Sequence, residues 1–152
     1  MITLRFSGGL GLAGRVIQAA TWSWCSHVDF ELPDGRLLGA VPGKGVCVRE
    51  PEAEAGRVEL FQADVPDWAV AYAKSQVGQP YDWGAVLGWA VHRDWQATDS
   101  WFCSELIAWS CQSASAPLLR ADASWRITPR DLLLSPHLTP VPAPAGYCPT
   151  TA

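Results

Sequence analysis

The segment "HVDFELPDGRLLGAV", residues 27–41, constrains the fold more than any other part of the sequence. Its first half alternates polar and apolar residues, so the side chains of His27 and Asp29 share one face of a strand. "PDG" is a typical turn sequence, and "RLLGAV" is a second run suited to a strand. The segment therefore predicts an antiparallel β-hairpin.

Other periodic segments predict the elements that surround this hairpin. Strands are expected over 2–6, 45–50 and 57–63, and helices over 12–21, 65–78, 82–93 and 99–114, with a helical turn within 126–136. A helix followed by an antiparallel sheet and then further helices is typical of the α+β class. We expect one domain over residues 1–136 and a Pro- and Ala-rich extended or disordered tail over 137–152.

Charge and hydropathy exclude several classes of partner. The net charge of −4 and the absence of a basic run argue against nucleic acid or an anionic membrane as the main partner. No apolar run approaches the length of a membrane span, and no signal peptide is recognisable. We therefore predict a protein that is cytoplasmic as synthesised, with export by another route left open; the oligomeric state is not predicted.

The five cysteines form an odd set without CxxC spacing. This pattern predicts neither a zinc site nor a disulfide framework, and no cofactor is expected. Cys103, in "SWFCSELIAWSC", lies near the start of a predicted helix that Asp99 or Ser100 would cap. It has two interpretations. It is either a small core residue, as Cys111 further along the helix is expected to be, or a nucleophile favoured by the positive end of the helix dipole.

A cysteine nucleophile requires a base, and the chain contains three histidines. His92 lies in a polar stretch and His137 in the Pro-rich tail, so both are expected on the surface. His27 begins the alternating strand on its polar face and is the best candidate. The sequence thus pairs Cys103 with His27.

Four segments together resemble one family. They are "CSHVDFELPDGRLLGA", "GQPYDWGA", "FCSELIAW" and "RITPRDLLLSP". The first three are similar to the histidine strand, the stretch before the nucleophile and the nucleophile helix of the NlpC/P60 cysteine peptidases. The histidine precedes the cysteine here, which resembles the circularly permuted branch, the YiiX/YaeF-like and lecithin:retinol-acyltransferase-like proteins. The fold that this resemblance implies is a circularly permuted papain-like fold.

The resemblance also implies roles for individual residues. Cys103 would be the nucleophile and His27 the general base and then acid. Tyr81 would help to hold the oxyanion, and Ser104 and Cys103 would contribute backbone N–H groups. The simpler alternative for Tyr81 is a half-buried core residue.

The chain departs from the family at the residue that usually orients the imidazole. That position falls on Gly39, which has no side chain. Either the site works as a dyad, or a carboxylate of the histidine strand takes over, Asp29 first and Glu31 second. Asp29 is separated from His27 by about 6.6–7 Å of strand rise, which is long for a direct bond. The expected alternatives are a contact bridged by a side chain or water, or a solvated surface carboxylate, which is the favoured one.

Three functions follow from these features. The leading prediction is a cysteine peptidase or amidase that hydrolyses an amide bond, with cell-wall peptides as the implied substrate class. The second is an acyltransferase or a hydrolase of lipid esters or thioesters, with Trp-rich segments such as "WSW" forming an apolar groove. The third is an inactive binding module of the same fold.

Overall fold

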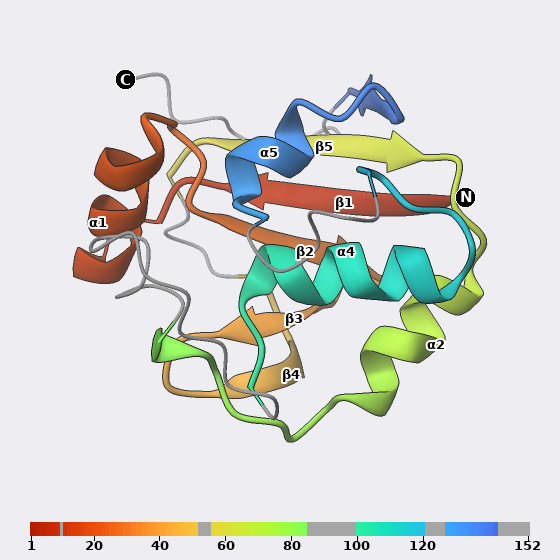
Figure 1. The fold of residues 1–152 in the computed structure, drawn as a ribbon, viewed down its shortest axis with the longest axis horizontal. Helices are drawn as coiled ribbons and strands as arrows, with labels where there is room; N and C mark the ends of the chain where they lie inside the picture. Colours follow the sequence, from red (N-terminus) through yellow and green to blue (C-terminus); the bar gives the residue numbers. More distant parts are fainter. Residues whose placement is uncertain (10, 52–55, 85–99, 121–126, 143–152) are drawn as a thin grey trace.

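The structure is a computed structural model that describes residues 1–9, 11–51, 56–84, 100–120 and 127–142 (Figure 1). Its centre is a six-stranded antiparallel sheet with the strand order β4-β3-β2-β1-β5-β6. The strands are β1 (Ile2–Ser7), β2 (His27–Glu31), β3 (Leu37–Val41), β4 (Gly45–Arg49), β5 (Val58–Ala63) and β6 (Leu138–Val141). The helices are α1 (Leu12–Thr21), α2 (Trp68–Ser75), α4 (Cys103–Ser113) and α5 (Pro129–Leu133).

The predicted hairpin is formed by β2 and β3. The two strands pair antiparallel with Phe30 opposite Leu38 and Glu31 opposite Leu37. Gly35 adopts a positive φ of 84° in the turn, a conformation that favours glycine. The predicted strands over 45–50 and 57–63 are confirmed as β4 and β5. The α+β class is therefore confirmed.

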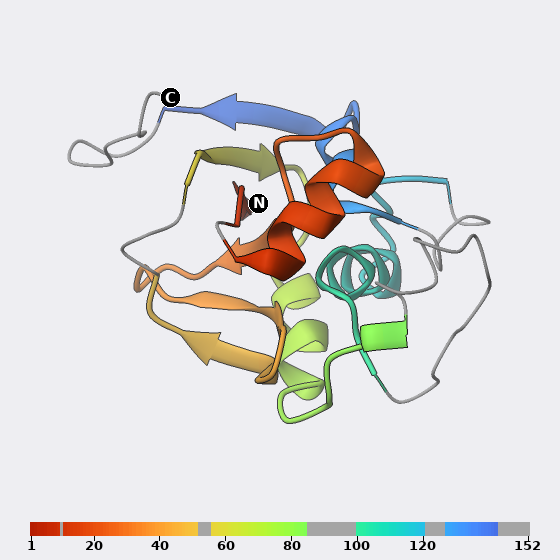
Figure 2. The ribbon, with the colours of Figure 1, turned by 90° about the vertical axis from the view of Figure 1, so that its left-hand side faces the viewer.

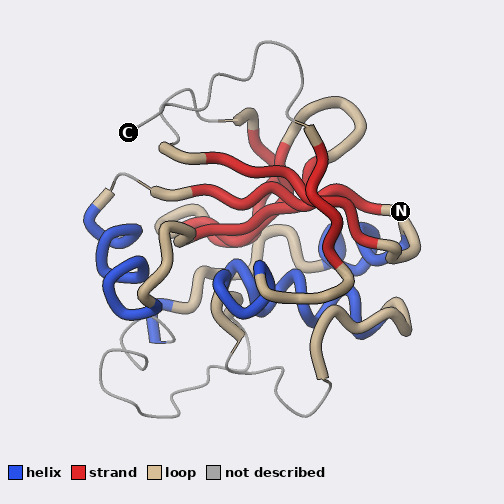
Figure 3. Tube along the Cα trace, turned by 90° about the horizontal axis from the view of Figure 1, so that it is seen from above, coloured by secondary structure: helices blue, strands red, loops and turns tan. Residues whose placement is uncertain are grey.

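Helices α2 and α4 lie together on one side of the sheet, as two views show (Figures 2 and 3). Helix α4 contacts β2 and β3 directly. Alternate residues of the strands and one face of α4 form the core, in which the following are fully buried: Leu4, Phe6, Val28, Phe30, Leu38, Leu106, Ile107 and Cys111. This packing fixes the N-terminus of α4 relative to β2.

Helix α4 begins later than the sequence predicts. Its first residue is Cys103 and its N-cap is Phe102, whereas Asp99 or Ser100 was expected to cap it. The capping side chain is that of Glu105, the third residue of the helix, which accepts a hydrogen bond from the backbone N–H of Phe102 at 3.4 Å. Cys103 is thus the first helical residue rather than the third or fourth.

Two further predictions concern the second half of the chain. The helix expected over 82–93 falls largely within residues 85–99, outside the described residues. Within the predicted tail, Leu138–Val141 form the edge strand β6, which pairs with β5. In the described part of the chain, no helix is long and apolar enough to cross a membrane.

Candidate active site

His27 is the first residue of β2, and its ring lies beside charged side chains of β2 and β4. Nε2 lies 3.0 Å from Oδ1 of Asp29, two residues along the same strand. Because an ionised carboxylate only accepts hydrogen bonds, Nε2 carries the proton in this contact. Only 15% of the His27 side chain is exposed. The ring is therefore held in a defined orientation, with Nδ1 left for another partner.

Asp29 is a fully buried carboxylate, and the expectation of a solvated or water-bridged residue is wrong. Arg49, from β4, donates from Nη1 to Oδ1 at 2.9 Å and from Nη2 to Oδ2 at 2.8 Å. Burial disfavours the charged form of Asp29, but His27 and then Arg49 outweigh burial and hold the pKa of this carboxyl well below its usual range. Asp29 is therefore an anion shared by two cationic partners.

Gly39 explains how the carboxylate fits between the strands. A Cβ atom at this position would lie 2.0 Å from Oδ1 of Asp29 and 3.1 Å from its Cγ. The space above Gly39, which has no side chain of its own, is filled by the Asp29 side chain. A larger residue at position 39 would therefore clash with Asp29.

Cys103 approaches the same ring from α4. Cys103 is one of the neighbours that raise the pKa of the His27 imidazole. Burial lowers the pKa of His27, but the attractions to Asp29 and then to Cys103, with hydrogen bonds to both, outweigh burial and raise it to about 10. The imidazole is thus a cation at neutral pH, beside the sulfur.

The other buried cysteines differ from Cys103 in their surroundings. Cys25 and Cys111 are fully buried, and burial raises the pKa of each thiol to about 12. The Cys25 thiol donates to the backbone oxygen of His27 at 3.4 Å. Both thiols are therefore neutral and unreactive at neutral pH. Cys111 is a core residue, as expected.

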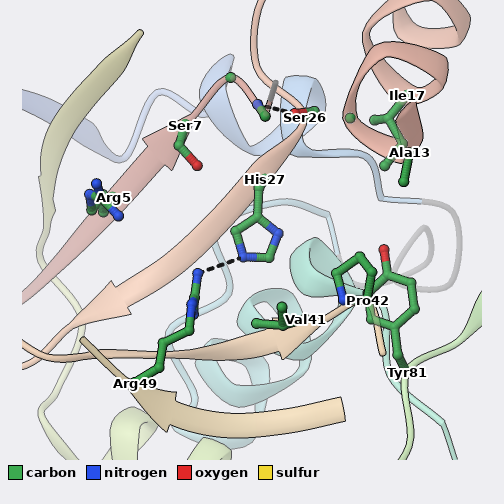
Figure 4. A pocket seen from close by; sticks show the side chains of 13 residues that line it. Arg5, Ser7, Ala13, Ile17, Ser26, His27, Val41, Pro42, Arg49 and Tyr81 are labelled. Atoms are coloured by element: carbon green, nitrogen blue, oxygen red, sulfur yellow. Dashed lines mark hydrogen bonds between the residues drawn. The ribbon is translucent and has the colours of Figure 1, made fainter. Parts of the chain in front are cut away.

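A cavity of about 140 Å³ opens beside the His27 ring (Figure 4). Its walls include Arg5, Ser7, Ala13, Ile17, His27, Arg49 and Tyr81, from β1, α1, β2, β4 and the segment before α4. Among the described residues that line it, Cys103 is not included, and its side chain has no exposed surface. The cavity therefore reaches the imidazole directly and the thiol only through its neighbours.

Tyr81 and Ser104 occupy different kinds of position. Tyr81 is 6% exposed and lines the cavity. Burial, followed by the charges of Cys103 and Asp82, raises the pKa of its phenol, so it remains a neutral donor. Ser104 is fully buried and its hydroxyl donates to the backbone oxygen of Ile127 at 2.6 Å. Its side chain is thus engaged in the fold, which leaves only its backbone for the site.

The remaining candidates lie away from this cluster or outside the described residues. His137 is exposed, as expected, and His92 falls within the segment that is not described. Burial raises the pKa of Glu31, while Arg5 acts in the opposite direction. Arg49 was not found from the sequence, because its approach to Asp29 depends on the register of β3 and β4. The alternation of "GVCVRE" was the only available signal.

Comparisons with known proteins give a likeness of fold. No protein-family model matches the chain, and no curated protein matches its sequence. A matching solved structure is that of the metalloprotein yiiX from Escherichia coli O157:H7, with a TM-score of 0.73 and 18% identity over 93% of this chain and 95% of that chain. The resemblance to YiiX-like proteins is thereby confirmed at the level of fold. The chain is a mixed α+β protein that shares its fold with this structure.

Proposed function

We propose that this chain is a thiol hydrolase that cleaves an amide bond, with Cys103 as nucleophile, His27 as general acid and base, and Asp29 as the residue that orients His27. The observation that carries the proposal is the His27 ring, which is held by Asp29 at 3.0 Å and has Cys103 among the groups that raise the pKa of its imidazole. Cys103 and His27 are 76 residues apart in the sequence. A cysteine, a histidine and a carboxylate in this order form the arrangement of a thiol nucleophile with an oriented base.

The proposed reaction proceeds in two steps. The Cys103 thiolate attacks the carbonyl carbon, the carbon–nitrogen bond breaks, and the His27 imidazolium gives its proton to the leaving amine. Water then loses a proton to the neutral ring and attacks the thioester, and the carbon–sulfur bond breaks to release the acid. The thiolate and the imidazolium are restored. Asp29 accepts from Nε2 throughout, so that Nδ1 faces the reacting atoms.

Backbone donors and Tyr81 would stabilise the oxyanion that develops in both steps. Cys103 is the first residue of α4 and Ser104 the second, where backbone N–H groups have no partner within the helix. Tyr81 retains its phenolic proton, so its hydroxyl is a suitable third donor. Because the sulfur has no exposed surface, attack requires a side chain beside Cys103 to move.

The family assignment belongs to the same proposal. The fold likeness to yiiX and the order of histidine before cysteine support a circularly permuted papain-like fold within the NlpC/P60 superfamily. The substrate class would then be a peptide, with cell-wall peptides first. No nucleic acid is proposed as a partner.

The described residues do not fit a metal site, although yiiX is described as a metalloprotein. Among them, no group of three or more His, Cys, Asp or Glu side chains could hold a metal ion. His27 is protonated at neutral pH, whereas a histidine that binds a metal must be neutral, and the charge of Asp29 is already balanced by Arg49. No step of the proposed reaction therefore uses a metal.

The test is turnover of a substrate panel that contains muropeptide-like amides, simple acyl amides, and acyl esters and thioesters. Cleavage is followed by liquid chromatography and mass spectrometry. Cys103→Ser and His27→Ala should abolish cleavage, whereas His137→Ala, at an exposed position, should leave it unchanged. Cleavage that survives Cys103→Ser would overturn the proposal.

A second candidate is hydrolysis or transfer of an acyl group from an ester or thioester. Helix α1 contributes Ala13 and Ile17 to the cavity wall, while Leu12 and Trp22 nearby in the chain are 82% and 89% exposed. An apolar wall, with exposed apolar residues on the same helix and at its end, suits an acyl chain. Cleavage of esters but not amides in the same panel would favour this candidate.

The third candidate, an inactive binding module, predicts no cleavage of any member of the panel. It also predicts that Cys103 is no more reactive toward alkylating agents than Cys111. Labelling of Cys103 alone would rule it out.

A further inference from the structure

We infer that Arg49 is a positioning residue of the proposed site, which holds the Asp29 carboxylate in place for His27 from across the intervening strand β3. The inference rests on the proposed function, in which Asp29 orients the His27 ring. Both terminal nitrogens of Arg49 donate to Asp29, one to each oxygen, at 2.9 and 2.8 Å. The Arg49 side chain is 12% exposed and that of Asp29 is not exposed. The pair is therefore shielded from water and from screening by salt.

The contact between Arg49 and Asp29 requires an arginine on β4 and a glycine, Gly39, on β3. Arg49 pairs with Leu37 across β3 and β4, and Gly39 pairs with Cys47. The guanidinium therefore reaches Asp29 diagonally across β3, at the place where Gly39 has no side chain. The planar fork of an arginine fixes a carboxylate through two parallel bonds, whereas a lysine would supply one point charge. Arg49 thus fixes the direction of the carboxylate as well as its charge.

Arg49 also limits how strongly Asp29 stabilises the imidazolium. Its Nη2 lies 3.4 Å from Nε2 of His27 (Figure 4), and with the proton on Nε2 this is an approach of two donors. A cation at this distance opposes a positive charge on the ring. During deacylation the thiolate is consumed, and the ring must be neutral to accept a proton from water. Arg49 therefore favours the state of His27 that deacylation needs.

Several charged or titratable groups act on the His27 ring and must be considered together. Asp29 lies on β2, Arg49 on β4 and Cys103 on α4, and Arg5 of β1 and Tyr81 line the same cavity. Acylation removes the Cys103 thiol from this set and leaves the other groups in place. The pH profile of deacylation therefore reports on the groups that remain around the ring, of which Asp29 and Arg49 lie nearest to Nε2.

The experiment uses p-nitrophenyl acetate, a small activated ester, as the probe. The burst of p-nitrophenol measures acetylation of Cys103, and the steady state measures deacetylation, each from pH 5 to 10. In Arg49→Met we expect deacetylation at pH 7 to slow by roughly 10- to 100-fold, the rate equivalent of one lost hydrogen bond to a charged group. Its pH profile should move up by about one pH unit or more, because a cation next to the ring is gone.

Two further variants separate charge from geometry and supply a control. Arg49→Lys keeps the charge, so its pH profile should stay near that of the wild type, while its rate should fall because the fork is lost. Arg36→Met removes an arginine from the exposed pair that Arg36 forms with Asp34, and both rates should be unchanged. A merely structural role for Arg49 would lower stability without moving the pH profile.

The outcomes distinguish this inference from the proposed function. No release of p-nitrophenol by the wild type above the uncatalysed rate, or a release that survives Cys103→Ser, overturns the proposed function and the inference with it. A Cys103-dependent burst with an unshifted Arg49→Met profile overturns the inference alone. If Arg49→Met does not fold, nitrogen NMR of the wild type decides: separate, slowly exchanging Nη signals of Arg49 support the fixed fork, and averaged signals overturn it.

Discussion

Replacing Gly39 with alanine is the most direct test of the geometry around Asp29. The new Cβ would lie 2.0 Å from Oδ1, so the carboxylate must move by about 1 Å or more to reach an ordinary contact distance. Such a shift disrupts the bonds of 2.8 to 3.0 Å that Asp29 makes with Arg49 and His27. The substitution adds one methyl group, so its effect on the site comes from the steric clash between this group and the Asp29 carboxylate.

The size of the effect follows from two known costs. Forcing an extra methyl group into a packed site costs about 1–3 kcal/mol, and removing one partner of a buried ion pair costs about 3–5 kcal/mol. Asp29 is displaced rather than removed, so we expect Gly39→Ala to lower the free energy of unfolding by about 2–4 kcal/mol. For a chain of this length, the melting temperature should fall by roughly 5–15 °C.

The assay is urea unfolding followed by tryptophan fluorescence, with two controls. Gly11→Ala adds the same methyl group where nothing lies within 4 Å, at a φ of −73°, and should cost less than about 1 kcal/mol. In an Asp29→Ala background the collision partner is gone, so Gly39→Ala should cost much less than in the wild type. An equal cost in both backgrounds, or a cost below about 0.5 kcal/mol in the wild type, would refute this reasoning.

Three further predictions concern the charged groups of the site. The ratio of the Cys103 alkylation rates by iodoacetamide at pH 6 and pH 9 should fall in His27→Ala but not in His137→Ala, and this ratio is insensitive to changes in access. Mass spectrometry that finds the ratio unchanged in His27→Ala would count against activation of Cys103 by His27. Because the pKa of His27 is raised to about 10 in the folded protein, protonation of His27 stabilises the fold. This contribution is fully present below pH 6.5 and falls as the pH rises toward 10. Melting temperatures should therefore decline over this range in the wild type and less in His27→Gln. Tyr81→Phe should slow hydrolysis on the order of 100-fold with little change in melting temperature; equal rates would remove Tyr81 from the oxyanion site.

The parts of the fold that local signals determine could be predicted from the sequence. Alternation and a "PDG" turn identified the hairpin of β2 and β3, and a helical period ending near Thr21 identified α1. These patterns depend on residues within a few positions of each other. The start of α4 was predicted too early, because Ser100 is a typical cap residue, whereas the cap is formed through the side chain of Glu105.

The environment of Asp29 could not be predicted, because it depends on contacts between strands. An aspartate on the polar face of a strand normally faces water, and strand rise alone places it too far from His27 for a direct bond. Its burial follows from Arg49, 20 residues away, and from the missing side chain at Gly39. The register that brings these residues together is set by the packing of β3 between its neighbours.

The residues at positions 29 and 39 depend on each other. An orienting side chain at position 39 and the Asp29 carboxylate would occupy the same volume, so a chain can carry only one of them. Glycine at position 39 alone would leave His27 without an orienting partner, and Asp29 with a larger residue at 39 would not fit. Arg49 then supplies a partner that the buried carboxylate would otherwise lack. It follows that a double substitution moving the carboxylate, Asp29→Gly with Gly39→Asp, should retain more activity than either single substitution, whereas additive losses would show that the two positions act independently.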